Sequence, residues 1–204
     1  MGKKKKKKGR GLTARTADRH VLYQESVQQP EHELELLTRI FRRHTGRKPL
    51  TLREDFCGTA LLCAAWAESR ADHSAIGLDI DTDVLAWGRE HNVAKLGEAA
   101  SRVKLLAQDV TKSTRTRSDL IVAFNYSYSV FKTRDDLRRY FAPAHKALED
   151  EGLFVLDAWG GWESQQPMVE KRQQDGFVYV WDQSKVDPIH SHVVNHIHFE
   201  FPDG

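Results

Sequence analysis

The sequence predicts an α/β fold in which a doubly wound, mostly parallel sheet is flanked by helices and followed by an antiparallel hairpin. Short apolar runs alternate with amphipathic segments from residue 48 to residue 160, and this alternation is typical of βαβ units with right-handed crossovers. Polar residues, mostly carboxylates, directly follow each apolar run. Because ligands of open α/β sheets bind at the carboxyl ends of the strands, the same pattern predicts a ligand site.

The composition bounds the class of protein. Of the 204 residues, 40% are hydrophobic and 29% are charged, as expected for one globular domain. No run of about 18 apolar residues could span a membrane, and the N-terminus lacks the apolar core of a signal peptide. We therefore expect a cytoplasmic protein without membrane association. The two cysteines, Cys57 and Cys63, are too few for a disulfide framework and are expected to fill apolar space.

The positive charge is concentrated at the N-terminus. The chain has a formal net charge of +2, but Lys3 to Lys8 and Arg10 contribute +7 of it, so the rest of the chain carries −5. Such a lysine run repels itself and cannot pack, so residues 1–16 are expected to be a disordered, lysine-rich tail. The tail either keeps the protein in solution or contacts a phosphate-rich partner such as RNA. Contact with nucleic acid is expected only through this tail.

Helical spacing and stop signals divide the rest of the chain into three regions. Residues 17–47 are expected to form an N-terminal lid segment and a helix that begins at Pro30 and ends at Gly46. Residues 48–160 are expected to be the sheet core. Its expected strands cover residues 50–53, 74–78, 103–107, 120–124 and 153–156, and its expected helices cover residues 59–69, 82–96 and 135–148.

The remaining region, residues 161–204, is expected to contain antiparallel strands. Apolar runs over residues 177–181 and 193–201 are joined through Asp187-Pro188 with no helix between them. The last two residues, Asp203-Gly204, are a strong signal for a hairpin turn. Since a further strand should follow such a turn, this region is expected to be truncated.

The strand ends carry the candidate ligand residues. The turn from Glu54 to Ala60 follows the first strand, and Asp79 follows the second, 21 residues after Gly58. An acid about 20 residues beyond a glycine turn binds ribose hydroxyls in nucleotide-binding sheets, and one carboxylate can accept two hydroxyls. The later strands end at Asp109, at Asn125 with Tyr126, and at Asp157.

These segments resemble the motifs of class I S-adenosylmethionine-dependent methyltransferases, which have a Rossmann-like core. The resemblance covers residues 48–160, with the family's motifs at residues 52–60, 75–81, 103–109, 119–128 and 147–157. The segment from Leu22 to Gln28, together with residues 53–59, resembles an uncharacterised bacterial subgroup of that family. In this family the glycine turn usually has three glycines, whereas Phe56 and Ala60 stand at two of those positions here.

The resemblance implies S-adenosylmethionine as cofactor and assigns a role to each strand end. Glu54 would lie near the methionine amino group, and Gly58 with Phe56 and Cys57 would let the backbone approach the methionine part. The other implied contacts are Asp79 to the ribose, Ile80 beside the adenine, Asp109 to the adenine amino group, the Val110 amide to the ring, and Asn125 beside the transferable methyl group.

The methyl acceptor is expected to be a small molecule. The fourth motif reads Phe124-Asn125-Tyr126-Ser127 and lacks the proline pair typical of enzymes that methylate amines of bases or glutamine. Asn125 and Tyr126 are the candidate catalytic residues, because the cofactor carries the chemistry and no general base is required. Two alternatives are a non-catalytic methyltransferase-fold binding protein and a nicotinamide-dependent oxidoreductase. The second lacks a G-x-G-x-x-G turn and a Tyr-x-x-x-Lys pair.

Four histidines near the C-terminal end of the chain all have even residue numbers. On one strand, His190, His192, His196 and His198 would share a face opposite Val193, Ile197 and Phe199. His-x-His on a strand can bind a metal, but no matching cluster of carboxylates and histidines stands elsewhere in the sequence. We therefore expect a solvated face and no metal. The sequence does not predict the oligomeric state.

Overall fold

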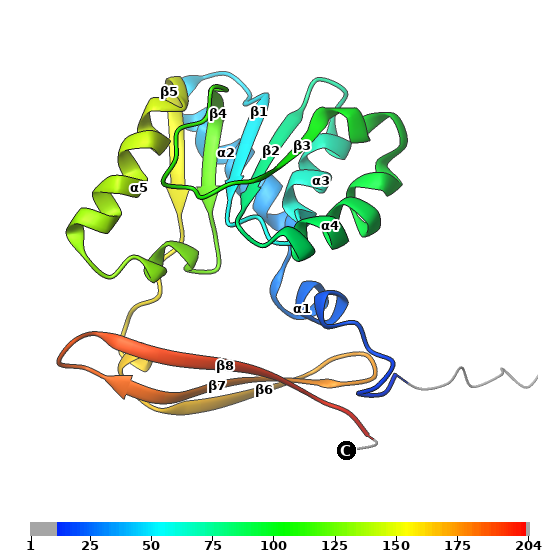
Figure 1. The fold of residues 1–204 in the computed structure, drawn as a ribbon, viewed down its shortest axis with the longest axis vertical. Coiled ribbons are helices and arrows are strands. Elements are labelled where there is room, and N and C mark those ends of the chain that lie inside the picture. Colours follow the sequence, from blue (N-terminus) through cyan, green and yellow to red (C-terminus); the bar gives the residue numbers. More distant parts are fainter. Residues whose placement is uncertain (1–11, 203–204) are drawn as a thin grey trace, which may run out of the picture. The chain divides into compact units, whose positions relative to one another are not determined.

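The computed structural model describes residues 12–202, which form two compact units (Figure 1). Residues 29–158 form one unit, and residues 12–28 together with residues 159–202 form the other. The helix that begins at Pro30 therefore belongs to the sheet unit, whereas the sequence analysis grouped it with residues 17–47. Most of the expected lysine-rich tail and the Asp203-Gly204 turn lie outside the described residues.

Five parallel strands form the sheet of the first unit. Their order is β3-β2-β1-β4-β5, and every neighbouring pair is parallel. The strands are β1 (Thr51–Asp55), β2 (Ser74–Asp79), β3 (Val103–Ala107), β4 (Ser118–Ala123) and β5 (Leu148–Leu156). The order reverses between β1 and β4, and ligands of doubly wound sheets bind at such a switch point. The predicted fold class is confirmed.

Helices connect these strands near the predicted positions. They are α2 (Pro30–Thr45), α3 (Leu61–Ser69), α4 (Thr82–His91), η1 (Val93–Arg102), η2 (Ser127–Val130) and α5 (Arg134–Lys146). The helix expected over residues 82–96 ends earlier, at His91. At Asn92 the chain passes from α4 into the 3-10 helix η1, and the Asn92 side-chain amide donates a hydrogen bond to the Thr59 carbonyl at 2.8 Å.

The helix α2 begins and ends as its sequence predicts. Pro30 stands at its start with Glu31 and Glu33 in the first turn, where acids favour the helix dipole. Gly46 ends it in the left-handed conformation, with its amide donating to the Arg42 carbonyl. Leu37 and Phe41 recur at helical spacing and are fully buried.

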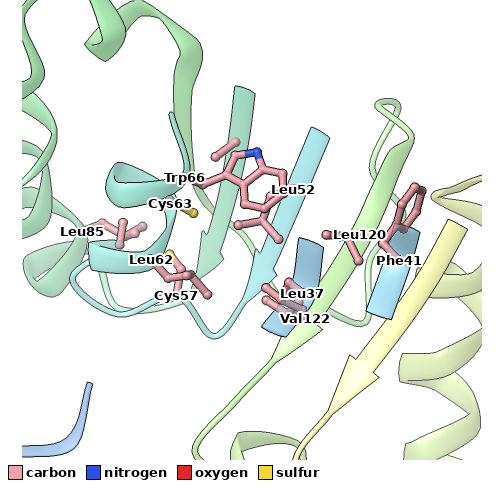
Figure 2. Close-up of a cluster of buried hydrophobic side chains, with 12 residues drawn as sticks. Leu37, Phe41, Leu52, Cys57, Leu62, Cys63, Trp66, Leu85, Leu120 and Val122 are labelled. Carbon is pink, nitrogen blue, oxygen red and sulfur yellow. The ribbon is translucent and has the colours of Figure 1, made fainter. Parts of the chain in front are cut away.

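The core of this unit lies between the sheet and its helices (Figure 2). Leu52 of β1 and Leu120 and Val122 of β4 meet the α2 side chains in one cluster. Trp66 of α3 is fully buried there, and its indole N–H donates to the Leu50 carbonyl at 3.3 Å. Cys57 and Cys63 are buried in the same cluster and unpaired, which agrees with their expected role as fillers.

The second unit contains a three-stranded antiparallel sheet with strand order β6-β7-β8. Its elements are α1 (Arg19–Val27), η3 (Glu163–Gln165), β6 (Met168–Gln173), β7 (Val178–Asp187) and β8 (His192–Glu200). The expected hairpin is β7 with β8. Sequence analysis missed β6 because only Met168 and Val169 in it are apolar and the strand lies at an edge.

The even-numbered face of β8 is exposed, as expected for its histidines. His192, His196 and His198 alternate with half-buried residues along the strand. His190 does not share this face, because it precedes β8 and its Nδ1 bonds the Asp187 carboxylate at 2.7 Å. The expectation that all four histidines lie on one strand is therefore wrong for His190. None of the helices within residues 12–202 is long and apolar enough to cross a membrane.

Replacing Gly77 of β2 tests how closely β2 packs against the turn after β1 and against β3. A Cβ at this position would lie 2.7 Å from Cys57 Sγ and 2.8 Å from Leu105 Cδ2. We expect Gly77→Ala to lower the free energy of unfolding by about 1–3 kcal/mol in urea titrations, since a packed core resists added volume. Adding Cys57→Ala should recover part of the loss. The control is Gly160→Ala, whose Cβ would meet nothing within 4 Å, and it should change stability by less than about 0.5 kcal/mol.

Candidate functional site

The turn after β1 has a left-handed backbone at three alternate residues. Phe56, Gly58 and Ala60 have φ angles of 58°, 51° and 56°. Such angles cost a residue with a side chain roughly 1–2 kcal/mol, so the surrounding contacts must hold the turn. Although the sequence has only one of the three usual glycines here, the backbone takes a glycine-type conformation at all three positions.

Contacts from β2 hold this turn in place. The Gly58 amide donates to Asp79 Oδ2 at 2.8 Å, and the Cys57 amide donates to the Leu78 carbonyl at 3.0 Å. Asp79 Oδ1 accepts the Asp81 amide at 3.0 Å. Because each carboxylate oxygen has two acceptor sites, Asp79 can still accept donors from a ligand while it holds the turn.

The space beside Gly58 is open. A Cβ built on Gly58 would meet nothing within 4 Å, so the turn presents bare backbone to whatever lies in front of it. Ile80, which follows Asp79, is 75% exposed. The turn and Ile80 therefore offer a backbone cradle and an apolar surface at the end of β2.

Glu54 lies behind the turn and is buried. Its Oε2 accepts the Cys63 amide from the first turn of α3 at 3.2 Å. Burial raises the pKa of Glu54 to about 8, with further contributions from the charges of Glu33 and Asp79. At neutral pH the carboxyl group is therefore largely protonated when nothing positively charged lies beside it.

Glu33 and Asp157 add two further carboxyl groups to this edge of the sheet. Glu33 lies in the first turn of α2, and burial raises its pKa, with a contribution from the charge of Asp157. Since Glu33 also acts on Glu54, the acids form one interacting group. Such a group attracts a positively charged ligand.

The residues after β4 have a strained backbone that Asp157 stabilises. Asn125 and Tyr126 have φ angles of 56° and 58°. Asp157 follows β5, and its two carboxylate oxygens accept the Asn125 amide at 2.8 Å and the Tyr126 amide at 2.9 Å. Asn125 is exposed and Tyr126 is half-buried. Burial raises the pKa of the Tyr126 hydroxyl, and the charge of Asp157 adds to the effect.

Asp109 and Val110 follow β3 and point to different environments. Asp109 is exposed, and its Oδ1 accepts both the amide and the hydroxyl of Thr111, at 2.8 and 2.7 Å. These hydrogen bonds lower the pKa of Asp109, so its carboxylate stays charged. Val110 is buried in a cluster with Leu78 and Tyr140.

A buried ion pair supports the turn from the other face of β1. Arg53 and Asp55 are both fully buried, with Arg53 Nε donating to Asp55 Oδ1 at 2.6 Å. The Tyr140 hydroxyl of α5 donates to Asp55 Oδ2 at 2.9 Å, and the Tyr140 ring contacts the Phe56 ring edge-on with centroids 5.7 Å apart. This network fixes the direction in which the chain leaves β1.

The strand ends predicted from the sequence thus meet at one edge of the sheet. Asp79 bonds the turn directly, Glu54 accepts an amide from the first turn of α3, and Asn125 and Tyr126 lie at the neighbouring end of β4. The sequence placed Asp157 at a strand end without indicating its role, and it did not single out Glu33 as part of the site. Among residues 12–202, no His, Cys, Asp or Glu side chains gather in threes that could hold a metal ion.

Comparisons with known proteins identify the class of fold. No family model and no curated protein matches this chain in sequence. Among the solved structures that match it at low identity, three that we describe below each have a TM-score of 0.64. An S-adenosylmethionine-dependent methyltransferase from Clostridium acetobutylicum is 15% identical, over 89% of this chain and 79% of that one.

Two further matches are named after sugar substrates. An amino pentose methyltransferase from Micromonospora echinaspora, solved with S-adenosylmethionine bound, is 15% identical over 89% of this chain and 80% of that one. A sugar N-methyltransferase from Streptoalloteichus is 14% identical over 98% and 83%. The chain therefore has the fold of class I S-adenosylmethionine-dependent methyltransferases.

The raised pKa of Glu54 predicts a pH dependence of stability. Between its ordinary pKa of 4.5 and its folded value of about 8, the folded state keeps a proton that the unfolded state releases. The contribution of Glu54 is therefore fully present below pH 4.5 and is lost as the pH rises, at about 1.4 kcal/mol per pH unit. Urea unfolding of the wild type and Glu54→Gln from pH 5 to 8 measures it. The stability difference between them should shift by a few kcal/mol in favour of the variant, and a constant difference would contradict the assignment.

The two hydrogen bonds to Asp157 predict a local effect. Asp157→Ala removes both acceptors from a strained turn, so the amides of Asn125 and Tyr126 should exchange with solvent at least about tenfold faster, consistent with hydrogen bonds that stabilise by about 1.5–3 kcal/mol when one partner is charged. Amide hydrogen exchange followed by NMR measures this directly. Asp136→Ala on α5 is the control and should leave these two amides unchanged.

Proposed function

We propose that this protein is an S-adenosylmethionine-dependent methyltransferase that acts on a small-molecule acceptor. The observation that carries the proposal is the open backbone at Gly58, whose amide is held by Asp79 and behind which the carboxyl group of Glu54 is buried, at the switch point of the sheet. The cofactor has a positively charged sulfonium and an amino group at one end and a ribose with adenine at the other. Both ends have complementary residues here.

The residues present fit this cofactor. Gly58, flanked by Phe56 and Cys57, leaves room for the methionine part, and Glu54 would lie near its amino group. A cation beside Glu54 would also favour loss of the proton that burial retains on this side chain. Asp79 has acceptor sites left for the ribose hydroxyls. On the adenine side, Ile80 offers an exposed apolar surface, Asp109 a charged acceptor and Val110 a backbone amide.

The protein's part in the reaction is binding and orientation. S-adenosylmethionine supplies a methyl group on a sulfonium, and the lone pair of an acceptor takes this methyl while the sulfur leaves as a thioether. Asn125 and Tyr126 are proposed to position the acceptor in line with the methyl group. Asp157 fixes their backbone, so it serves as a positioning residue. The acceptor can release its proton to water, so no general base is required.

Two observations support a small acceptor. The two sugar methyltransferases that this chain resembles are named after small substrates, and each matches it with a TM-score of 0.64. The charge of the chain beyond the lysine run is −5, which disfavours a polyanionic acceptor such as RNA. A small amine or hydroxyl compound, such as an amino sugar, fits both observations.

The first test is calorimetric titration with S-adenosylmethionine and its demethylated product. We expect micromolar binding that Asp79→Ala weakens at least about tenfold, because hydrogen bonds to a charged acceptor are worth roughly 1.5–3 kcal/mol each. Gly58→Ala should weaken binding to a similar extent while lowering the free energy of unfolding by only about 1–2 kcal/mol, since its Cβ enters open space. Asp135→Ala, an exposed carboxylate of α5, is the matched control and should bind like the wild type.

The alternatives give different results in the same experiment. Binding of NADH in preference to S-adenosylmethionine would establish an oxidoreductase and refute the proposal. Tight binding of the cofactor without methyl transfer to any member of an amine and sugar panel would support a non-catalytic binding protein. Absence of binding by folded wild-type protein would refute both the cofactor and the reaction.

A further inference from the structure

A concave surface lies at the edge of the sheet opposite the proposed cofactor site. This groove of about 690 Å³ is formed by α2, by Ser69 at the end of α3 and by Arg70 and His73, which link α3 to β2. These residues directly precede β2, whereas Asp79 ends it. Since the six residues of β2 extend roughly 20 Å, the groove is separate from the proposed cofactor site.

Positive charge without a partner dominates this groove. Arg39, Arg42 and Arg43 line it from α2, and their spacing places them on one face of the helix. All three are exposed, and within residues 12–202 they form no ion pair. Arg70 is the exception, since it binds Asp72 through two hydrogen bonds of 2.8 and 2.6 Å.

This concentration of arginines differs from the rest of the molecule. Beyond the lysine run the chain carries −5, and the one acid that lines the groove is Glu35. Arg42 and Arg43 lie in the last turn of α2, where the helix dipole favours cations. Like charges three and four residues apart on a helix still repel each other, so an anion bound between these side chains would relieve the repulsion. The charge of the groove is therefore local and complements a compact anion.

We infer that the groove binds the polyphosphate group of a small ligand, such as a nucleoside di- or triphosphate. Guanidinium groups bind phosphate oxygens through two parallel hydrogen bonds, and the hydroxyl of Thr38 adds a donor to the lining. The side chain of Leu34 offers an apolar wall. The volume lies within the range of about 300–1,000 Å³ typical of small-molecule sites. An extended polynucleotide fits less well, because the acidic remainder of the chain would repel it.

The test uses inorganic tripolyphosphate, which lacks adenosine and so cannot use the adenosine contacts of the proposed cofactor site. The protein is the full chain with Lys3 to Lys8 replaced by serine, so that the lysine run does not contribute. Calorimetric titration at about 0.1 M salt, where charges more than about 10 Å apart are screened, should show one site. The double variant Arg39→Gln with Arg43→Gln should bind at least about tenfold more weakly, because each lost guanidinium removes charge-assisted hydrogen bonds.

The matched control removes the same charge elsewhere on the same unit. Arg138→Gln with Arg139→Gln lies on α5, where both arginines pair with neighbouring acids, and this variant should keep the affinity of the parent chain. The groove variant should also bind S-adenosylmethionine as well as the parent does, so this test and the test of the cofactor site can fail separately. Thermal unfolding confirms that each variant is folded.

Several outcomes would overturn the inference. They are no binding of tripolyphosphate, an equal loss in the α5 control, or undiminished binding by the groove variant. Titration with ATP and with a single-stranded RNA completes the comparison. Binding of ATP lost in the groove variant supports a nucleotide ligand, whereas RNA binding tighter than that of either small ligand would indicate a polynucleotide and contradict the proposal.

Discussion

The hydrogen bond from the Gly58 amide to Asp79 joins the turn after β1 to the end of β2. The other parts of the candidate site depend on it, because it holds a turn whose backbone is left-handed at Phe56 and Ala60 without glycine at either position. Gly77 allows this arrangement, since any side chain there would collide with Cys57. The same carboxylate that shapes the turn is the proposed acceptor for the cofactor, so folding and binding rely on one group.

The opposite face of β1 carries a buried ion pair. Arg53 and Asp55 are charged and fully buried, and removing one partner of such a pair typically costs about 3–5 kcal/mol because the other charge is left without compensation. Tyr140 and Thr114 complete their hydrogen bonds. The network links β1 to α5 through polar contacts that have one geometry, whereas apolar packing alone would tolerate several. Phe56 is thereby fixed against Tyr140, which compensates in packing for its unfavourable backbone angle.

Local patterns in the sequence predicted the fold and the strand ends well. The apolar runs and the spacing from Gly58 to Asp79 placed the turn and the acid correctly, because both depend on residues close in the chain.

The role of Asp157 was missed because its partners, Asn125 and Tyr126, are about 30 residues away and meet it only once β4 and β5 pair. Glu33 has the sequence signature of a helix start, and only the packing of α2 against the sheet brings it near Glu54. Strand β6 was not predicted because it is an edge strand of mostly polar residues, so it lacks the alternation of apolar and polar residues on which strand prediction rests. The arginine groove likewise forms between α2 and the residues that precede β2, and no local sequence pattern predicts that these two segments lie together.

The position of β5 has a consequence for the way the site can lose its structure. Within the described sheet, β5 pairs with β4 alone, and edge elements of a domain open at free energies below that of global unfolding. When the end of β5 frays, Asp157 moves away with it and the strained residues after β4 lose both of their acceptors. The proposed acceptor side of the candidate site would then disorder while the proposed cofactor side, anchored on the strands β1 and β2, remains intact. Warming or mild denaturant should therefore abolish turnover before it abolishes cofactor binding.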